Sequence, residues 1–264
     1  MLTLVGRSFR RQAGMFLSVL GLLVAFQFSL IAVATSFAER GDFERLAQML
    51  PAFIQNALGP SLRSFAGMSL IGFVEPGPVL LVVIFLVYLA SEPAAEVEAG
   101  LVDLVLARPL ARQLLITRTL LLMAIAVVSF EAATGVAIWL GLLWLAPAGV
   151  AWPRASDALT LMAYLTATAW CCGSIALAVA ARSRRRASAL GPVAIGVVAM
   201  YLLQQLGDVW PVARHLAVLS PFHYFPGSEV LNGATDLALN MTVLGAASVF
   251  FIALAYWQFS RRDL

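Results

Sequence analysis

Six apolar runs, each long enough to cross a lipid bilayer, constrain this chain more than any other feature. A membrane-spanning helix needs about 20 apolar residues at a rise of about 1.5 Å each. The runs cover residues 15–38, 64–90, 113–145, 158–181, 187–207 and 237–260. They predict an all-α, polytopic membrane protein with six transmembrane helices, in which residues 1–264 form a single transmembrane domain.

The second run differs from the others because the string Glu75-Pro76-Gly77-Pro78 interrupts it. Proline removes a backbone hydrogen bond and kinks or ends a helix. We therefore expect a broken helix, with Glu75 near its outer end as a candidate gate. A turn that is exposed to water at the membrane interface is the alternative.

Composition narrows the possible functions. Charged residues make up 12% of the chain, whereas a soluble domain carries about 25%. The Arg residues are divided among short connecting segments and form no continuous basic face, so we expect no nucleic-acid partner. The chain contains no Lys, and a P-loop needs a Lys to reach the nucleotide phosphates. We therefore expect ATP hydrolysis on a separate partner subunit and not on this chain. No residue is assigned a catalytic role.

The distribution of Arg predicts the orientation in the membrane, because cytoplasmic loops carry an excess of positive charge. One set of connections and ends holds Arg7, Arg10, Arg11, Arg108, Arg112, Arg118, Arg182, Arg184, Arg185, Arg186, Arg261 and Arg262. The other set holds Arg40, Arg45, Arg63, Arg154 and Arg214. The first set is therefore expected in the cytoplasm, with both termini, in a bacterial inner membrane.

Residues 1–14 are predicted to form an interfacial helix. Leu2, Val5 and Phe9 fall close to one helical face, while Arg7, Arg10 and Arg11 occupy the rest. Such a helix lies along the membrane with its Arg side chains towards anionic lipid headgroups. The alternative is an unstructured positive flank that only sets the topology.

Two outer connections are expected to contain structure. Residues 39–63 have the spacing of an interfacial amphipathic helix, interrupted by Pro51. Residues 208–236 are long for a loop and carry aromatic side chains suited to the membrane interface. We expect a short helix or a re-entrant element in the second of these.

The cytoplasmic connection 91–112 is longer than topology requires. Ser91 is expected to cap a helix with Pro93 in its first turn, and Arg108-Pro109 to end it. Acidic residues cluster at its start and Arg at its end. Such an element favours a docking surface for a cytoplasmic partner, although a solvated amphipathic helix without a partner is the alternative.

Three motifs resemble the type-2 ABC exporter permeases. The string Glu98-x-Gly100-x-x-Asp103-x-x-Leu106-Ala107-Arg108-Pro109-x-x-Arg112 is similar to their signature loop. The segments Leu219-Ser220-Pro221-Phe222-His223-Tyr224 and Phe259-Ser260-Arg261-Arg262-Asp263-Leu264 resemble two further strings of that family. Leu101 and Val102 depart from the usual Thr-Leu pair, and the start of the loop is unusually acidic.

The resemblance implies a dimer, with a second copy of the permease or a homologue, and a cytoplasmic ABC ATPase subunit in two copies. ATP and Mg would be bound by that ATPase, while this chain would bind no cofactor and no metal. The implied coupling residues are Glu92, Glu96, Glu98, Gly100, Asp103, Arg108, Pro109 and Arg112. Charge reversal at Glu98 or Asp103 is expected to disturb ATPase docking and to leave membrane insertion intact.

Glu131 lies well inside the third run and is followed by small residues. Because a charge in the bilayer is costly, such a side chain faces protein or water. It either lines a cavity, where it contacts substrate or a proton, or is neutral and hydrogen-bonded within the bundle.

Two other functional classes compete with an ATP-driven exporter. A secondary transporter driven by an ion gradient would be expected to show paired broken helices, but only the second run is interrupted. An intramembrane enzyme would need a nucleophile with its base, or a metal cluster. The sequence contains neither Gly-x-Ser-x-Gly nor His-Glu-x-x-His.

Overall fold

The computed structural model describes residues 2–41, 43, 45, 64–100, 113–207, 210–225, 227, 230 and 236–261. Across these residues the regular structure is helical, and none of them belongs to a strand. The long helices are α1 (Leu2–Arg40), α5 (Pro76–Ala90), α8 (Gln113–Leu145), α9 (Ala155–Arg182), α10 (Arg186–Gly207) and α12 (Leu237–Ser260). The short ones are α4 (Phe65–Leu70), η1 (Ile71–Phe73), α6 (Glu92–Glu98), α11 (Pro211–Ala217) and η2 (Pro221–Tyr224).

In the part of the chain that the structure describes, six helical stretches are long and apolar enough to cross a membrane, which agrees with the predicted number. They are Arg10–Arg40, Phe65–Glu98, Gln113–Leu145, Ala155–Arg182, Arg186–Gly207 and Leu237–Ser260. Their bounds agree with the apolar runs to within a few residues, except that the second stretch runs on through α6. The chain is therefore a multi-pass membrane protein.

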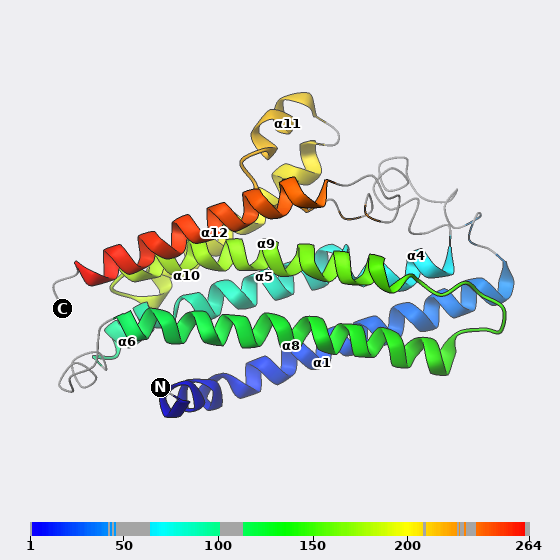
Figure 1. Ribbon diagram of the computed structural model, residues 1–264, viewed down its shortest axis with the longest axis horizontal. Coiled ribbons are helices and arrows are strands. Elements are labelled where there is room, and N and C mark those ends of the chain that lie inside the picture. The colour runs from blue at the N-terminus through cyan, green and yellow to red at the C-terminus, as the bar shows by residue number, and fades with distance from the viewer. Residues whose placement is uncertain are drawn as a thin grey trace.

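The long helices run side by side along one axis (Figure 1). α9 occupies the middle, where it packs against α12, α5, α8 and α10, while α1 packs mainly on α8. α1 begins, and α12 ends, at the end of the bundle that carries α6 (Figure 1). We call this end, defined by α6, the α6 end.

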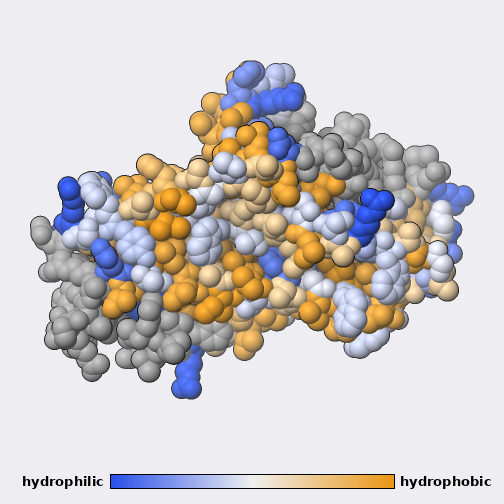
Figure 2. All heavy atoms as spheres, in the orientation of Figure 1, coloured by the Kyte–Doolittle hydropathy of each residue, from blue (hydrophilic) through white to orange (hydrophobic). Residues whose placement is uncertain are grey.

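The outer surface of the bundle is apolar. Hydrophobic residues cover most of its middle, and most hydrophilic ones lie towards the two ends and on the projecting α11 region (Figure 2). On α12, Val249 and Phe250 are 68% and 61% exposed. An extended apolar surface of this kind is favoured against lipid or another apolar surface.

Three aromatic rings form the centre of the core at the α1, α5 and α8 contact. Phe16 stacks on Phe130 with 5.0 Å between the ring centroids, and Phe85 meets Phe130 edge-on at 5.1 Å. Phe85 and Phe130 are fully buried. Phe16 and Phe85 also meet each other, with 6.2 Å between their centroids, so the three rings hold α1, α5 and α8 together through the geometry that aromatic pairs prefer.

The second span is broken where the sequence predicts. α4 ends at Leu70 and η1 ends at Phe73, and α5 begins at Pro76. Proline suits this position because the first residue of a helix has no partner for a backbone N–H within the helix. Glu75 is the N-cap residue of α5, but its side chain makes no capping hydrogen bond. It is half-buried.

Close packing of η1 against α1 depends on Gly72. Gln27 of α1 donates from Nε2 to the carbonyl of Ser69 at 2.7 Å, which holds its Oε1 against Gly72. A methyl group on Gly72 would overlap that oxygen and would lie 3.2 Å from Leu30 Cδ1.

Gly72→Ala is therefore expected to destabilise the fold by about 1–3 kcal/mol, the usual cost of overpacking. Gly77→Ala is the matched control, because nothing lies within 4 Å of an added methyl group there. Denaturant titration of both variants in detergent measures the difference. Equal stability of the two would contradict the close approach of η1 to α1.

The N-terminal segment is helical from Leu2 on, as predicted, and not an unstructured flank. It is not a separate helix, because α1 runs without a break through all of Leu2–Arg40. No Pro interrupts this stretch, and the helix continues through Gly6, Gly14 and Gly21. Its 39 residues extend about 58 Å at 1.5 Å each, longer than the hydrocarbon core of about 30 Å. Arg10 and Arg11 are exposed, and the side chain of Arg7 lies outside the described part.

The segment after α10 contains the short helix that the sequence predicts, α11. It then turns back into the bundle, where Ser220 Oγ donates to the carbonyl of Met200 at 3.1 Å. Phe222 is buried, with its ring 5.2 Å from that of Tyr201. The amphipathic helix expected within 39–63 lies largely outside the described residues.

Candidate functional site

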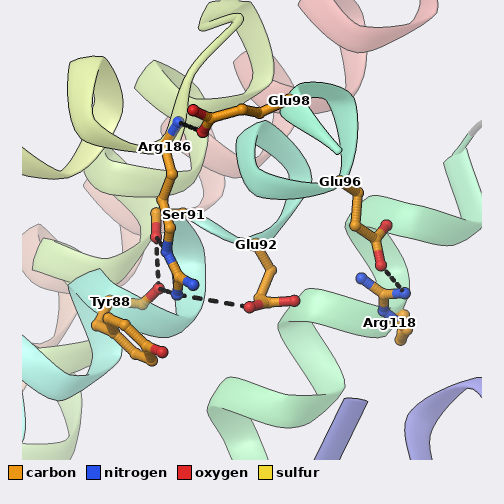
Figure 3. Close-up of polar contacts among 7 residues, drawn as sticks. All are labelled: Tyr88, Ser91, Glu92, Glu96, Glu98, Arg118 and Arg186. Atoms are coloured by element: carbon orange, nitrogen blue, oxygen red, sulfur yellow. Dashed lines mark hydrogen bonds and ion pairs between the residues drawn. The ribbon is translucent and has the colours of Figure 1, made fainter. Parts of the chain in front are cut away.

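The α6 end carries a cluster of acidic and basic side chains that come from three helices. Glu92, Glu96 and Glu98 belong to α6, Arg118 to α8 and Arg186 to the first turn of α10. We call these five residues the α6 cluster (Figure 3).

α6 follows α5 after a single residue, Ser91, and Pro93 lies in its first turn as predicted. Ser91 does not cap α6 with its side chain. Its hydroxyl donates instead to the carbonyl of Tyr88 at 2.6 Å. The helix ends at Glu98, ahead of the predicted end at Arg108-Pro109, and Gly100 follows with φ +64°. That left-handed backbone suits glycine and turns the chain away from the helix axis.

Glu96 and Arg118 form an ion pair that is closed off from solvent. Arg118 Nη1 lies 2.6 Å from Glu96 Oε1, and the side chains are 5% and 11% exposed. In surroundings of low polarity, each of these charges depends on the other for compensation. The pair therefore fixes α6 to the start of α8 (Figure 3).

Arg186 joins α6 and α5 to the start of α10. Its Nη2 donates to the carbonyl of Tyr88 at 3.1 Å, and its Nε donates to Ser91 Oγ at 2.9 Å. The guanidinium lies 3.9 Å over the Tyr88 ring and pairs with Glu92 at 3.4 Å. The Glu92 side chain is 2% exposed, so Arg186 is its charge partner inside the bundle.

Glu98 is exposed and stands at the far end of α6. Its Oε2 accepts a hydrogen bond from the backbone N–H of Arg186 at 2.8 Å. This N–H belongs to the first turn of α10, where backbone donors lack partners within the helix. Glu98 therefore caps α10 and still presents its charge to solvent.

The sequence assigns Glu92 and Glu96 to a docking surface, but the structure turns both into the bundle. They are four residues apart and so share one face of α6, which is the face packed against α8 and α10. Among the described coupling residues, only Glu98 and Gly100 are exposed. Asp103, Arg108, Pro109 and Arg112 lie outside the described residues.

Sequence reasoning assigned no partner to the two acids. Arg118 and Arg186 entered it only as charges that set the orientation. Two sequence features together could have predicted these ion pairs. Glu92 and Glu96 are four residues apart, and an Arg lies at the start of each of two other spans. An amphipathic helix with acids on the same face as its small residues indicates charge partners inside the bundle.

Glu75 and Glu131 are apart from the α6 cluster. Glu131 is 5% exposed, in the middle of α8, and lines a small cavity with residues of α1 and α5. Glu75 precedes α5 at the break in the second span and does not line that cavity.

Comparisons with family models, curated proteins and solved structures find no match.

Proposed function

We propose that this chain is the transmembrane permease subunit of an ATP-binding cassette exporter, which forms the substrate path as a dimer. A separate cytoplasmic ABC ATPase, in two copies, binds ATP and Mg and supplies the energy. The second permease copy is identical or homologous, the termini are cytoplasmic, and the membrane is the bacterial inner membrane.

One observation supports this proposal above the others. The segment that resembles the family's signature loop begins with a helix that is fixed by buried charges to α8 and α10. A force on the exposed end of α6 is therefore transmitted to three spans together, because α6 also follows α5 after a single residue. In this proposal Glu98, Gly100 and residues 101–112 contact the ATPase, while Glu92 and Glu96 hold α6 in place.

The ion-gradient transporter and the intramembrane enzyme remain the competing functions. Neither of them gives the α6 cluster a role. Both predict activity from the purified chain alone, whereas the exporter requires the ATPase.

Single-cysteine labelling tests the orientation and the partner together. Ala99 is exposed next to Glu98, and Trp152 is 48% exposed in the α8–α9 connection at the opposite end of the bundle. The native Cys171 and Cys172 are buried, so they are shielded from reagents in water. We expect Ala99→Cys to react with an impermeant maleimide only in inverted vesicles, and Trp152→Cys only in intact cells.

The same variants, coupled to a photoreactive probe and co-expressed with the ATPase encoded nearest to this gene, report the contact. The Ala99→Cys variant is expected to cross-link to the ATPase, and the Trp152→Cys variant is not. Labelling of Ala99→Cys from outside the cell, or transport of cargo by the chain alone, would overturn the proposed function.

A further inference from the structure

A small cavity with polar walls lies within the bundle, between α1, η1, α5, α8 and α9. Its volume of about 10 Å³ is room for about one water molecule. Most of its lining is apolar, but Gln27, Glu131 and Thr134 are polar and buried, 1%, 5% and 7% exposed. The break in the second span borders it through Gly72, Phe73 and Pro78.

The polar groups that reach this cavity are hydrogen-bond acceptors. Gln27 donates from Nε2 to the carbonyl of Ser69 at 2.7 Å, so its Oε1 is the atom that can accept a hydrogen bond in the cavity. The Thr134 hydroxyl donates to the carbonyl of Phe130 at 2.9 Å, so towards the cavity it can only accept a hydrogen bond. Within the described residues, Gln27 Oε1 and Glu131 Oε2 are buried without a hydrogen-bond partner. The site therefore lacks donors.

Among the residues that the structure describes, no positive side chain lines the cavity or forms an ion pair with Glu131. It is the one titratable residue among the ten that line the cavity. Arg118 is thirteen residues away along α8, about 20 Å at 1.5 Å per residue. On the described helices that pack against α8, the other charged residues lie in α6 or towards helix ends: Arg10, Arg11, Glu39, Arg40, Glu92, Glu96, Glu98, Asp157 and Arg182. Glu75, Arg154, Asp236 and Arg261 flank the ends of α5, α9 and α12. An ionised carboxylate here would cost at least about 2.5–3.5 kcal/mol.

We propose that this cavity is a proton-binding site, in which Glu131 carries the proton and one water molecule links it to Gln27. The carboxylic acid donates to the water oxygen. The two water hydrogens then go to Gln27 Oε1 and to Thr134 Oγ1, so that each donor has an acceptor. A metal ion fits less well, because three side-chain oxygens in a cavity of one water's size leave its coordination incomplete.

The site stands apart from the ATPase docking proposed above, since it depends on none of the same residues. Buried carboxyl groups of this kind mark proton pathways in membrane proteins. Release of the proton would leave an uncompensated carboxylate beside the junction of η1 and α5. Separation of that junction would admit water to the charge, so protonation and the shape of the second span are coupled.

Infrared spectroscopy of the full chain in lipid nanodiscs tests the protonation state directly. At neutral pH in D2O, we expect the wild type to show the C=O band of a protonated carboxylic acid. Glu131→Gln should lose the band, and Glu131→Asp should shift it. Glu39→Gln, which changes an exposed acid, should retain it. Only monodisperse variants are compared, and Glu131→Asp keeps the test valid if Glu131→Gln does not fold.

Two further measurements test whether the site binds a proton or sodium, and whether a water molecule connects Glu131 to Gln27. Gln27→Leu removes an acceptor and should move the band to higher frequency, while Gln12→Leu, also on α1, should leave it in place. Addition of NaCl at constant pH should not remove the band. Its absence from the wild type at neutral pH, its loss on addition of sodium, or an unchanged frequency in Gln27→Leu would each overturn the proposal.

Discussion

Arg118→Met is expected to destabilise the chain by about 3–5 kcal/mol, the cost of leaving one member of a buried ion pair without its partner. Glu96 has 11% of its side chain exposed and pairs with Arg118 at 2.6 Å. Its Oε2 has no hydrogen-bond partner within the described residues. Once Arg118 is removed, the Glu96 carboxylate must become neutral or draw water into the packed end of the bundle.

The double variant Arg118→Met/Glu96→Leu distinguishes the loss of the whole ion pair from the loss of one partner. It replaces both charges with apolar groups, which in buried positions is often neutral or stabilising. We therefore expect the double variant to unfold near the wild-type denaturant concentration in detergent. Arg185→Met is the control for loss of a positive charge, because Arg185 is exposed and directly precedes Arg186 of the α6 cluster. Wild-type stability of Arg118→Met would contradict the buried pair.

Glu98→Arg is expected to reduce recovery of the ATPase with the permease by more than about tenfold, which corresponds to about 1.4 kcal/mol. The substitution places a positive charge at the exposed end of α6, where we propose that the ATPase binds. Co-purification from membranes at fixed ionic strength measures the loss. Residual binding should become less sensitive to salt if the contact is electrostatic.

Because Glu98 also caps α10, a second variant must separate docking from stability. Glu98→Gln keeps an oxygen that can accept from the Arg186 N–H and removes only the charge. It should retain wild-type stability and show intermediate recovery of the ATPase. Glu98→Arg loses the capping bond as well, worth about 1 kcal/mol, and should remain inserted and folded. Normal ATPase recovery from Glu98→Arg would count against α6 as the docking element.

The helices follow from the sequence because their signals are local. A run of about 20 apolar residues identifies a span without reference to any other segment, and Pro76 with Pro78 marks the break in the second span. The end of α6 was predicted too late because Gly100, which precedes the apolar residues Leu101 and Leu104, was not considered as a helix end. The continuity of α1 was not predicted because the charge pattern suggested a boundary at Gly14, through which the helix continues.

The site was harder to predict because its contacts are not local. Glu96 and Arg118 are 22 residues apart, and Ser91 and Arg186 are 95 apart. No periodicity within one segment relates such residues, since their distance depends on how α8 and α10 pack against α6. The prediction therefore found the right segment and placed two of its acids on the wrong face.

The break in the second span also has a consequence for biogenesis. α5 has 15 residues, about 22 Å at 1.5 Å each, which is too short for a hydrocarbon core of about 30 Å. Irregular backbone at membrane depth is tolerated only when protein covers it, and η1 contacts both α1 and α9. α9 is synthesised after this span, so the second span reaches its final form only when the later helix has left the translocon and closed over it.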